Sequence, residues 1–196
     1  QSYALYRSLG IGEPLLCPDL AFRARPAIGA RHDADAPYFC VTGSAAMDEY
    51  DLGAYAVLIR DLAATTGLRP LLLYSKHDDS RLMAAMAEAL PVGSYAAVNS
   101  KCMATYDGIL PILRDARFVI GGRYHTAVTA LAQATPVILL PANTHKNEGL
   151  ATMLGIEQDD TLGPARALAD AMRLTWGREG RAHRGFFLRA EDFFGF

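Results

Sequence analysis

A chain of 196 residues that is 51% hydrophobic and 20% charged, with a net charge of -2, has the composition of a globular protein with one full core. Its pI of about 6.2 reflects no excess of basic residues, so we expect no nucleic acid among its partners. The longest apolar runs are far shorter than the roughly 20 residues that span a bilayer, which argues against a membrane span in this chain.

Five short apolar runs alternate with helical patterns along the chain, as in a parallel α/β sheet. The runs do not alternate apolar with polar residues, which is typical of strands covered on both faces. We therefore predict a Rossmann-like doubly wound parallel sheet with helices on both faces. The expected strands are Tyr38 to Val41, Pro70 to Tyr74, Ala96 to Val98, Phe118 to Ile120 and Val137 to Leu140.

Helices are predicted from apolar spacing, from capping residues and from glycines that follow the last turn. Either Asp79 or Ser80 is suited to cap the second of them. The expected helices are Asp48 to Thr65, residues 80 to 90, Tyr106 to Asp115, Thr126 to Ala134, Asn143 to Leu154 and Leu162 to Trp176.

The expected domain runs from residue 38 to residue 184. Residues 1–24 read as a helix and a segment that join a preceding domain, and because the chain begins at Gln1 within a helical pattern we expect a fragment of a longer protein. Residues 25–37 read as an irregular connection. Residues 185–196 form an aromatic tail that we expect to present an apolar surface, chiefly through Phe186, Phe187, Phe193 and Phe194.

The cysteines and histidines do not fall into a metal-binding pattern. Cys17, Cys40 and Cys102 are far apart and lack the Cys-x-x-Cys spacing, so neither a disulfide framework nor a zinc site is indicated. We therefore expect no metal and a reducing, cytoplasmic location. The common hydrolase, metalloprotease, nucleotide triphosphatase and dinucleotide motifs are also missing, which argues against those classes.

Ligands of open parallel sheets bind beyond the carboxyl ends of the strands, so the loops that follow the predicted strands hold the candidate site. The loop at residues 42–44 contains Ser44, and the loop at residues 75–78 contains Lys76 and His77. Lys76 and His77 precede two aspartates, so they can also be read as the polar start of a helix.

The loop at residues 121–125 is the most informative of these. Gly121 and Gly122 let the backbone approach a ligand, and the following helix presents its amide groups to an anion. Arg123 is suited to a carboxylate or phosphate, and His125 can transfer a proton near neutral pH. The alternative is a tight turn with a helix-capping histidine.

Lys146 follows the fifth predicted strand and can bring a second cation to the same edge of the sheet. The alternative is a solvated lysine on a helix face, and the residues alone leave both interpretations open.

Two stretches resemble the polysaccharide pyruvyl transferase family. The run from Phe118 to Ala132 is similar to that family's strand, Gly-x-Arg-x-His loop and alanine-rich helix, and the stretch from Thr135 through Lys146 to Ile156 is similar to its second motif. Residues 2–11 and Cys17 to Phe22 resemble a helix that ends at a Leu-Gly pair before a Pro-Asp-x-Ala-Phe segment. One departure is that the family's arginine upstream of this helix would precede residue 1.

The resemblance implies an enzyme that moves the pyruvyl group of phosphoenolpyruvate onto two sugar hydroxyls of a cell-surface or exopolysaccharide precursor, forming a ketal. It implies one half of a two-domain GT-B fold, the C-terminal donor-binding half, with an N-terminal domain as its partner. His125 would be catalytic, and no cofactor is implied. The donor would be held by Gly121, Gly122, Arg123, Tyr124, Lys146, His77, Lys76 and Ser44.

The implied acceptor is a saccharide, lipid-linked acceptors included, which would place the enzyme in the cytoplasm at the inner face of the membrane. A homo-oligomer is left open. Two other functions compete with this one: a GT-B glycosyltransferase that uses a nucleotide sugar, and a non-catalytic sugar- or anion-binding domain derived from such an enzyme. Glu148 is the nearest candidate for the acidic ribose contact that a nucleotide-sugar enzyme needs.

Overall fold

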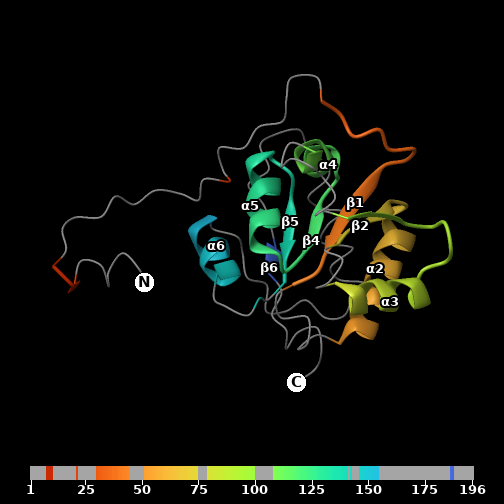
Figure 1. Ribbon diagram of the computed structural model, residues 1–196, viewed down its shortest axis with the longest axis horizontal. Helices are drawn as coiled ribbons and strands as arrows, with labels where there is room; N and C mark the ends of the chain where they lie inside the picture. Colours follow the sequence, from red (N-terminus) through yellow and green to blue (C-terminus); the bar gives the residue numbers. More distant parts are fainter. Residues whose placement is uncertain are drawn as a thin grey trace.

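The structure is a computed structural model that describes residues 8–10, 21, 30–44, 51–74, 79–99, 108–140, 142, 146–154 and 186–187. These residues form one parallel sheet with helices on both of its faces (Figure 1). The strands are β1 (Tyr38–Thr42), β2 (Arg69–Tyr74), β3 (Ala96–Asn99), β4 (Val119–Gly121), β5 (Val137–Leu139) and β6 (Phe186–Phe187).

The strand order in space is β3-β2-β1-β4-β5-β6, and every neighbouring pair runs parallel. This is the order of the dinucleotide-binding doubly wound folds, in which the chain first winds outward to β3 and then returns to the other side of β1. The predicted doubly wound α/β class is therefore confirmed. Strand β1 lies in the centre, where all five of its residues are buried.

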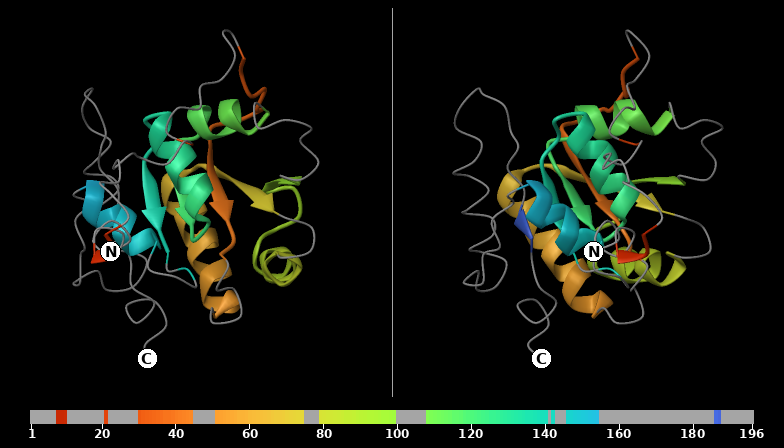
Figure 2. Two further views of the ribbon diagram at one scale, coloured as in Figure 1. Left: turned by 60° about the vertical axis from the view of Figure 1, so that its left-hand side comes forward. Right: turned by 90° about the vertical axis from the view of Figure 1, so that its left-hand side faces the viewer.

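Helices cover the sheet in two layers, which Figure 2 shows from two sides. Residues of α2 and α3 join one buried apolar cluster, and residues of α4, α5 and α6 join a second cluster on the opposite face. The helices are α2 (Leu52–Thr66), α3 (Ser80–Ala89), α4 (Ile109–Asp115), α5 (Tyr124–Ala132) and α6 (Lys146–Leu154).

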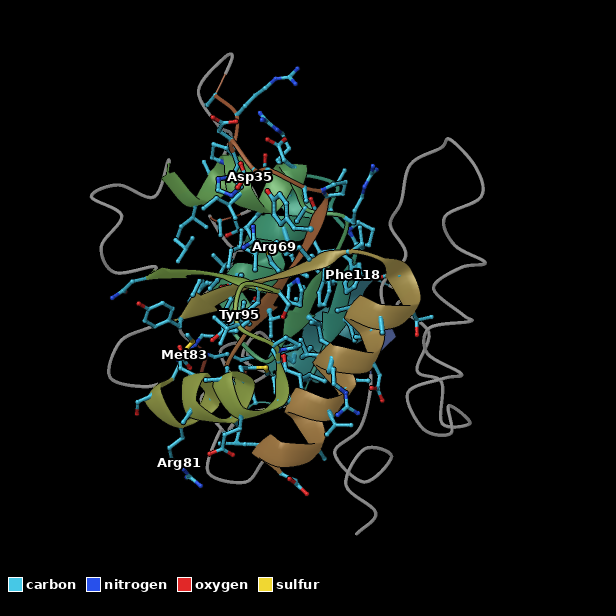
Figure 3. All side chains as sticks on the ribbon, turned by 90° about the vertical axis from the view of Figure 1, so that its right-hand side faces the viewer. Asp35, Arg69, Arg81, Met83, Tyr95 and Phe118 are labelled. Carbon is cyan, nitrogen blue, oxygen red and sulfur yellow. The ribbon has the colours of Figure 1, made fainter. Side chains whose placement is uncertain are left out.

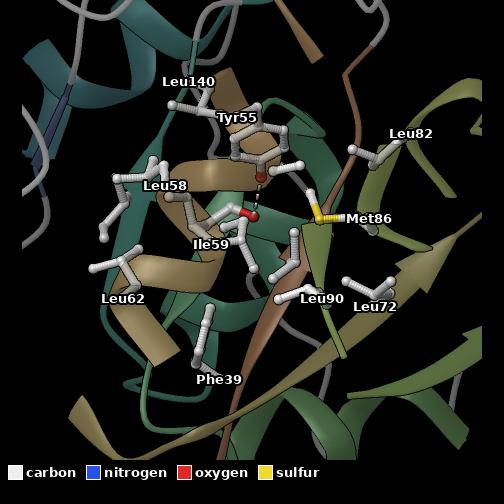
Figure 4. Close-up of a cluster of buried hydrophobic side chains, with 14 of the residues drawn as sticks. Phe39, Tyr55, Leu58, Ile59, Leu62, Leu72, Leu82, Met86, Leu90 and Leu140 are labelled. Carbon is white, nitrogen blue, oxygen red and sulfur yellow. Dashed lines mark hydrogen bonds between the residues drawn. The ribbon is translucent and has the colours of Figure 1, made fainter. Parts of the chain in front are cut away.

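Local sequence signals explain where α2 begins and ends. The carboxylate of Asp51 accepts a hydrogen bond from Ala54 N at 2.9 Å, which satisfies one of the amides that a helix start leaves unpaired. Gly67 ends the helix in the left-handed conformation, with φ 68°, and its N–H donates to Ala63 O. The buried face of α2 carries Tyr55 into the core (Figure 4). Its single hydroxyl hydrogen is shared between the backbone oxygens of Thr42 and Ile120, at 3.2 Å and 3.4 Å from the phenolic oxygen.

The two central strands lead to opposite faces of the sheet. Strand β1 is followed by α2 on one face, and its neighbour β4 is followed by α5 on the other. Such a divergence is the topological switch point at which open α/β sheets bind ligands. The two strands can lie this close at their carboxyl ends only because residue 121 is a glycine. A Cβ atom there would lie 2.6 Å from Thr42 O and would overlap the Thr42 hydroxyl.

All five predicted strands are present, with ends that differ by at most one residue. The prediction for α5 was wrong by two residues, since the helix begins at Tyr124 and the left-handed Ala134, with φ 62°, already lies beyond its end. Apolar composition alone does not mark these ends. Residues 186–187, which the sequence pattern assigns to the tail, pair with β5 as an edge strand that is too short to show a period.

Several expected segments fall outside the described residues. These include most of residues 1–29, the helix expected at residues 162–176, and the phenylalanines at positions 193 and 194. Within the part of the chain that the structure covers, no helix has the combined length and apolar character that a membrane crossing requires.

The close contact at Gly121 predicts a large difference between two glycine substitutions. Gly121→Ala should lower the free energy of unfolding by at least about 2 kcal/mol, because φ is +152° and the new Cβ has no space. Gly149→Ala is the matched control, since that position lies in α6 with open space around it and should gain up to about 1 kcal/mol. Urea unfolding of both variants measures the difference, and equal stabilities would contradict the role given to Gly121.

Candidate functional site

The loops that follow β1 and β4 meet at the switch point. Gly122 N donates to Gly43 O at 3.1 Å, and Leu140 N donates to Gly121 O at 3.1 Å, so the ends of β1, β4 and β5 are tied together through backbone groups. Ser44, a predicted site residue, lies in the first of these loops and is buried. The backbone at Gly43, Gly121 and Gly122 is therefore closely packed, and the side chain of Arg123 follows directly after it.

Arg123 contacts a carboxylate from another strand-end loop. Its Nη2 atom lies 2.7 Å from Oδ1 of Asp79, the residue that precedes α3. The Asp79 side chain is wholly buried, whereas 29% of the Arg123 side chain is exposed. Arg123 thus reaches across the switch point while part of its surface faces solvent.

The Tyr124 ring contacts both His125, the predicted catalytic residue, and Lys146, a predicted binding residue. The His125 ring meets it edge to face, with 5.3 Å between the ring centres and an angle of 80°. Lys146 Nζ is 5.9 Å from the centre of the same ring, a separation at which a cation is attracted to the aromatic face. The structure therefore brings Tyr124, His125 and Lys146 together at the carboxyl end of the sheet.

His125 occupies the first turn of α5 and is exposed. The N-cap position of this helix belongs to Arg123, whose backbone is extended with φ -79° and ψ 103°, and not to His125. The alternative of a helix-capping histidine therefore does not describe its position. The backbone oxygen of His125 accepts a hydrogen bond of 2.6 Å from the Thr129 hydroxyl within the helix.

Asn147 connects α6 to the glycine loop. Its side chain is completely buried, and Nδ2 donates to Gly122 O at 3.1 Å and to Leu140 O at 2.7 Å. These two bonds determine which end of the amide faces the carbonyl groups. Since Asn147 follows Lys146 directly, the same contacts hold the start of α6, and with it the lysine, beside the Gly121 loop.

Lys76 and His77, also predicted at this edge, lie outside the described residues, as does the histidine at position 145. Asp79, which is described, lies at the switch point. Among the described residues, no three histidine, cysteine, aspartate or glutamate side chains gather in a way that could hold a metal ion.

A pocket of about 160 Å³ lies at the opposite, amino end of β1, β2 and β3. Its lining includes His32, Asp35 and Arg69, of which Figure 3 labels the last two. Arg69 donates through Nη2 to the backbone oxygens of Gly93 and Tyr95, which holds the guanidinium at the edge of the sheet. Since ligands of open parallel sheets bind at the carboxyl ends of the strands, we place the candidate site at the switch point and not here.

Two polar residues of the site were not predicted as such. Asp79 was recognised only as a candidate helix cap, and Asn147 was not singled out. A polar residue at the start of a helix is common, and nothing in the local pattern distinguishes one that caps its own helix from one that reaches another loop. Only burial identifies them, since both side chains are removed from solvent.

The chain is similar to one known protein family and to one solved structure. A family model described as polysaccharide pyruvyl transferase matches residues 1–143, a range that includes Arg123 and His125 and ends before Lys146. Among solved structures, the E. coli heptosyltransferase WaaC with ADP-2-deoxy-2-fluoro heptose is similar, with 18% identity and a TM-score of 0.45. The match covers 88% of this chain and 53% of that one, so this chain spans about half its length. No curated protein matches in sequence.

The two bonds from Asn147 predict a pH-dependent defect. In Asn147→Asp an ionised carboxylate would face two carbonyl oxygens, so we expect a loss of about 3 kcal/mol in unfolding free energy near pH 8. Burial and the carbonyl oxygens should raise the folded-state pKa above its unfolded value. The penalty should therefore be smallest near the unfolded pKa of about 4 and should grow as the pH rises.

Asn147→Ala is the control, because it removes the same hydrogen bonds without adding a titratable group. Its deficit relative to the wild-type protein should stay constant between about pH 8 and about pH 5. Urea unfolding across this range compares the two variants. If both deficits are independent of pH, Asn147 does not face the two carbonyl groups as described.

Proposed function

The chain belongs to the polysaccharide pyruvyl transferase family, and we propose that it forms the donor site of an enzyme that transfers the pyruvyl group of phosphoenolpyruvate to a saccharide. The observation that carries the proposal is the grouping of Arg123, Tyr124, His125 and Lys146 at the switch point. These residues come from two different strand-end junctions and converge at the edge where parallel sheets bind ligands.

The chemistry of the grouping suits this donor. Phosphoenolpyruvate carries a carboxylate and a phosphate, which are the groups that guanidinium, ammonium and helix amino ends bind best. Arg123 and Lys146 supply the two cations, and the first turn of α5 supplies amides. Since Asp79 already pairs with Arg123, we assign to Lys146 a large share of the attraction between the site and the donor.

The proposed reaction consumes one phosphoenolpyruvate and two hydroxyl groups of one sugar. Proton addition to the methylene carbon makes the methyl group, and a first hydroxyl oxygen bonds to the central carbon. A second hydroxyl oxygen then displaces phosphate at that carbon, which closes the ketal. Of the two hydroxyl protons, one balances the proton added to carbon and the other leaves with the phosphate, so no oxidant or cofactor is needed.

We assign the proton transfer to His125. An imidazole can give and take a proton near neutral pH, and the exposed position of His125 beside Tyr124 allows it to meet a bound donor. It serves either as the acid at the methylene carbon or as the acid that assists the departing phosphate.

We infer that this chain is the C-terminal half of a GT-B arrangement and that a second domain faces the switch point and binds the acceptor. The acceptor is a cell-surface or exopolysaccharide precursor, lipid-linked precursors included, which would place the enzyme on the cytoplasmic side of the membrane.

Substitutions of Arg123 and His125 should separate donor binding from chemistry in the full-length protein. Arg123→Ala removes a charge-assisted contact, so the Kd for phosphoenolpyruvate should rise roughly tenfold to a hundredfold. His125→Ala removes the proton-transfer group, so turnover at saturating donor should fall about a hundredfold to ten-thousandfold with a smaller change in Kd. Calorimetric titration measures the first effect, and phosphate release in the presence of acceptor measures the second.

Arg60→Ala is the matched control for lost positive charge, because Arg60 lies exposed on α2 and pairs with Asp61. It should leave both the Kd and the turnover unchanged. Titration with UDP-N-acetylglucosamine in place of phosphoenolpyruvate tests the competing class. If the protein binds the nucleotide sugar and not phosphoenolpyruvate, the proposed function is wrong and a glycosyltransferase is favoured.

A further inference from the structure

The proposed function gives Asp79 no contact with the donor, although its carboxylate is the most deeply buried of the charged groups described at the site. Its side chain has no exposed surface, and Oδ1 lies 2.7 Å from Arg123 Nη2. The two residues are 44 positions apart in sequence, and they begin helices on opposite faces of the sheet. Their contact therefore crosses the switch point at the level of the glycine loop.

The carboxylate does not serve its own helix. Asp79 stands at the N-cap position of α3, where an aspartate ordinarily accepts a hydrogen bond from an amide of the first turn. Here φ is -114° and ψ is 15°, and the side chain makes no capping bond. The carboxylate of Asp79 instead contacts the guanidinium of Arg123, which belongs to another element. The position of the carboxylate is therefore determined by the contact between the two elements and not by capping of α3.

The surroundings also hold the carboxylate in place. The backbone of Gly43 closes on it, and a Cβ atom at that position would overlap Oδ1 and come within 3.0 Å of Cγ. A buried carboxylate is costly without a partner, so the guanidinium and the carboxylate each restrict where the other can lie. The Gly43 loop therefore limits the movement of the Asp79–Arg123 pair on the side of β1.

We infer that Asp79 is a positioning residue, which holds the guanidinium of Arg123 in the orientation that receives the anionic group of the donor. The inference rests on the proposed function of the site. A guanidinium is planar and directs its five N–H donors along fixed lines, so a bond at one end of the group sets the directions of the others. When the donor binds, less free energy is then spent on ordering the Arg123 side chain, because Asp79 already holds its guanidinium in place.

A competing role makes the opposite prediction. If Asp79 only neutralised the site, removal of its negative charge would strengthen the attraction for an anionic donor, and the KM for phosphoenolpyruvate would fall. If Asp79 positions Arg123, the same change frees the guanidinium to turn away, and the KM rises. The direction of the change in KM therefore distinguishes the two roles.

The test uses Asp79→Asn and Asp79→Ala in the full-length protein. Asp79→Asn keeps the shape and one acceptor oxygen, so the KM for phosphoenolpyruvate should rise about threefold to tenfold, and Asp79→Ala should raise it further. The kcat should stay within about threefold, because the proton-transfer group is unchanged. Asp61→Asn, which removes an exposed carboxylate that pairs with Arg60, should change neither parameter.

A double-substitution cycle shows whether Asp79 acts through Arg123. In an Arg123→Ala background, Asp79→Asn should have no further effect on KM, because the group that it positions is gone. Additive effects, or a fall in KM in the single variant, would overturn the inference. Thermal unfolding accompanies each measurement, and if Asp79→Ala does not fold, the isosteric Asp79→Asn decides the question alone.

Failure of the proposed function and failure of the positioning role give different results. If the wild-type protein binds UDP-N-acetylglucosamine and not phosphoenolpyruvate, the proposed function fails, and the same cycle is measured as the Kd for the nucleotide sugar. A rise in that Kd with Asp79→Asn that vanishes without Arg123 would still support the positioning role. An unchanged Kd would overturn it.

Discussion

The carboxyl ends of β1 and β4 approach so closely that no side chain fits between Thr42 and Gly121. Because Gly121 has none, Gly122 can donate its amide hydrogen to Gly43, and the two central strands stay joined up to their last residues. The chain then turns to opposite faces of the sheet from this one junction. The position of the site depends on that contact, since the residues that follow both strands leave the sheet from this junction.

The site is assembled from the beginnings of three helices. Helix α3 contributes Asp79, α5 contributes the Arg-Tyr-His run, and α6 contributes Lys146 and Asn147. The buried and the exposed residues of the candidate site differ in what they contact. The buried members, Asp79 and Asn147, hold backbone or charged groups in place, and the more exposed members offer a cation or an imidazole.

The net charge of the site and the direction of its hydrogen bonds come from different residues. The charge of Arg123 is offset by an adjacent carboxylate, so the pair contributes little net charge at long range. Under the proposed function, Lys146 and the amino end of α5 would provide the attraction for an anion, and the guanidinium held by Asp79 would provide directed hydrogen bonds. A site of this kind selects an anion by its shape as well as by its charge, which suits a donor with two different acidic groups.

Local sequence patterns were enough to predict the parallel strands, the doubly wound class and the placement of Arg123, His125 and Lys146 at strand ends, because apolar runs and helical spacing record local burial. Strand order, the two-residue β6 and the pairing of Arg123 with Asp79 were decided by the tertiary structure. Asp79 showed the pattern of a helix cap, and Asn147 showed none. Asp79 contacts Arg123, 44 residues away, and Asn147 contacts Gly122, 25 residues away. Contacts over such distances depend on which strands become neighbours, a property that no local pattern records.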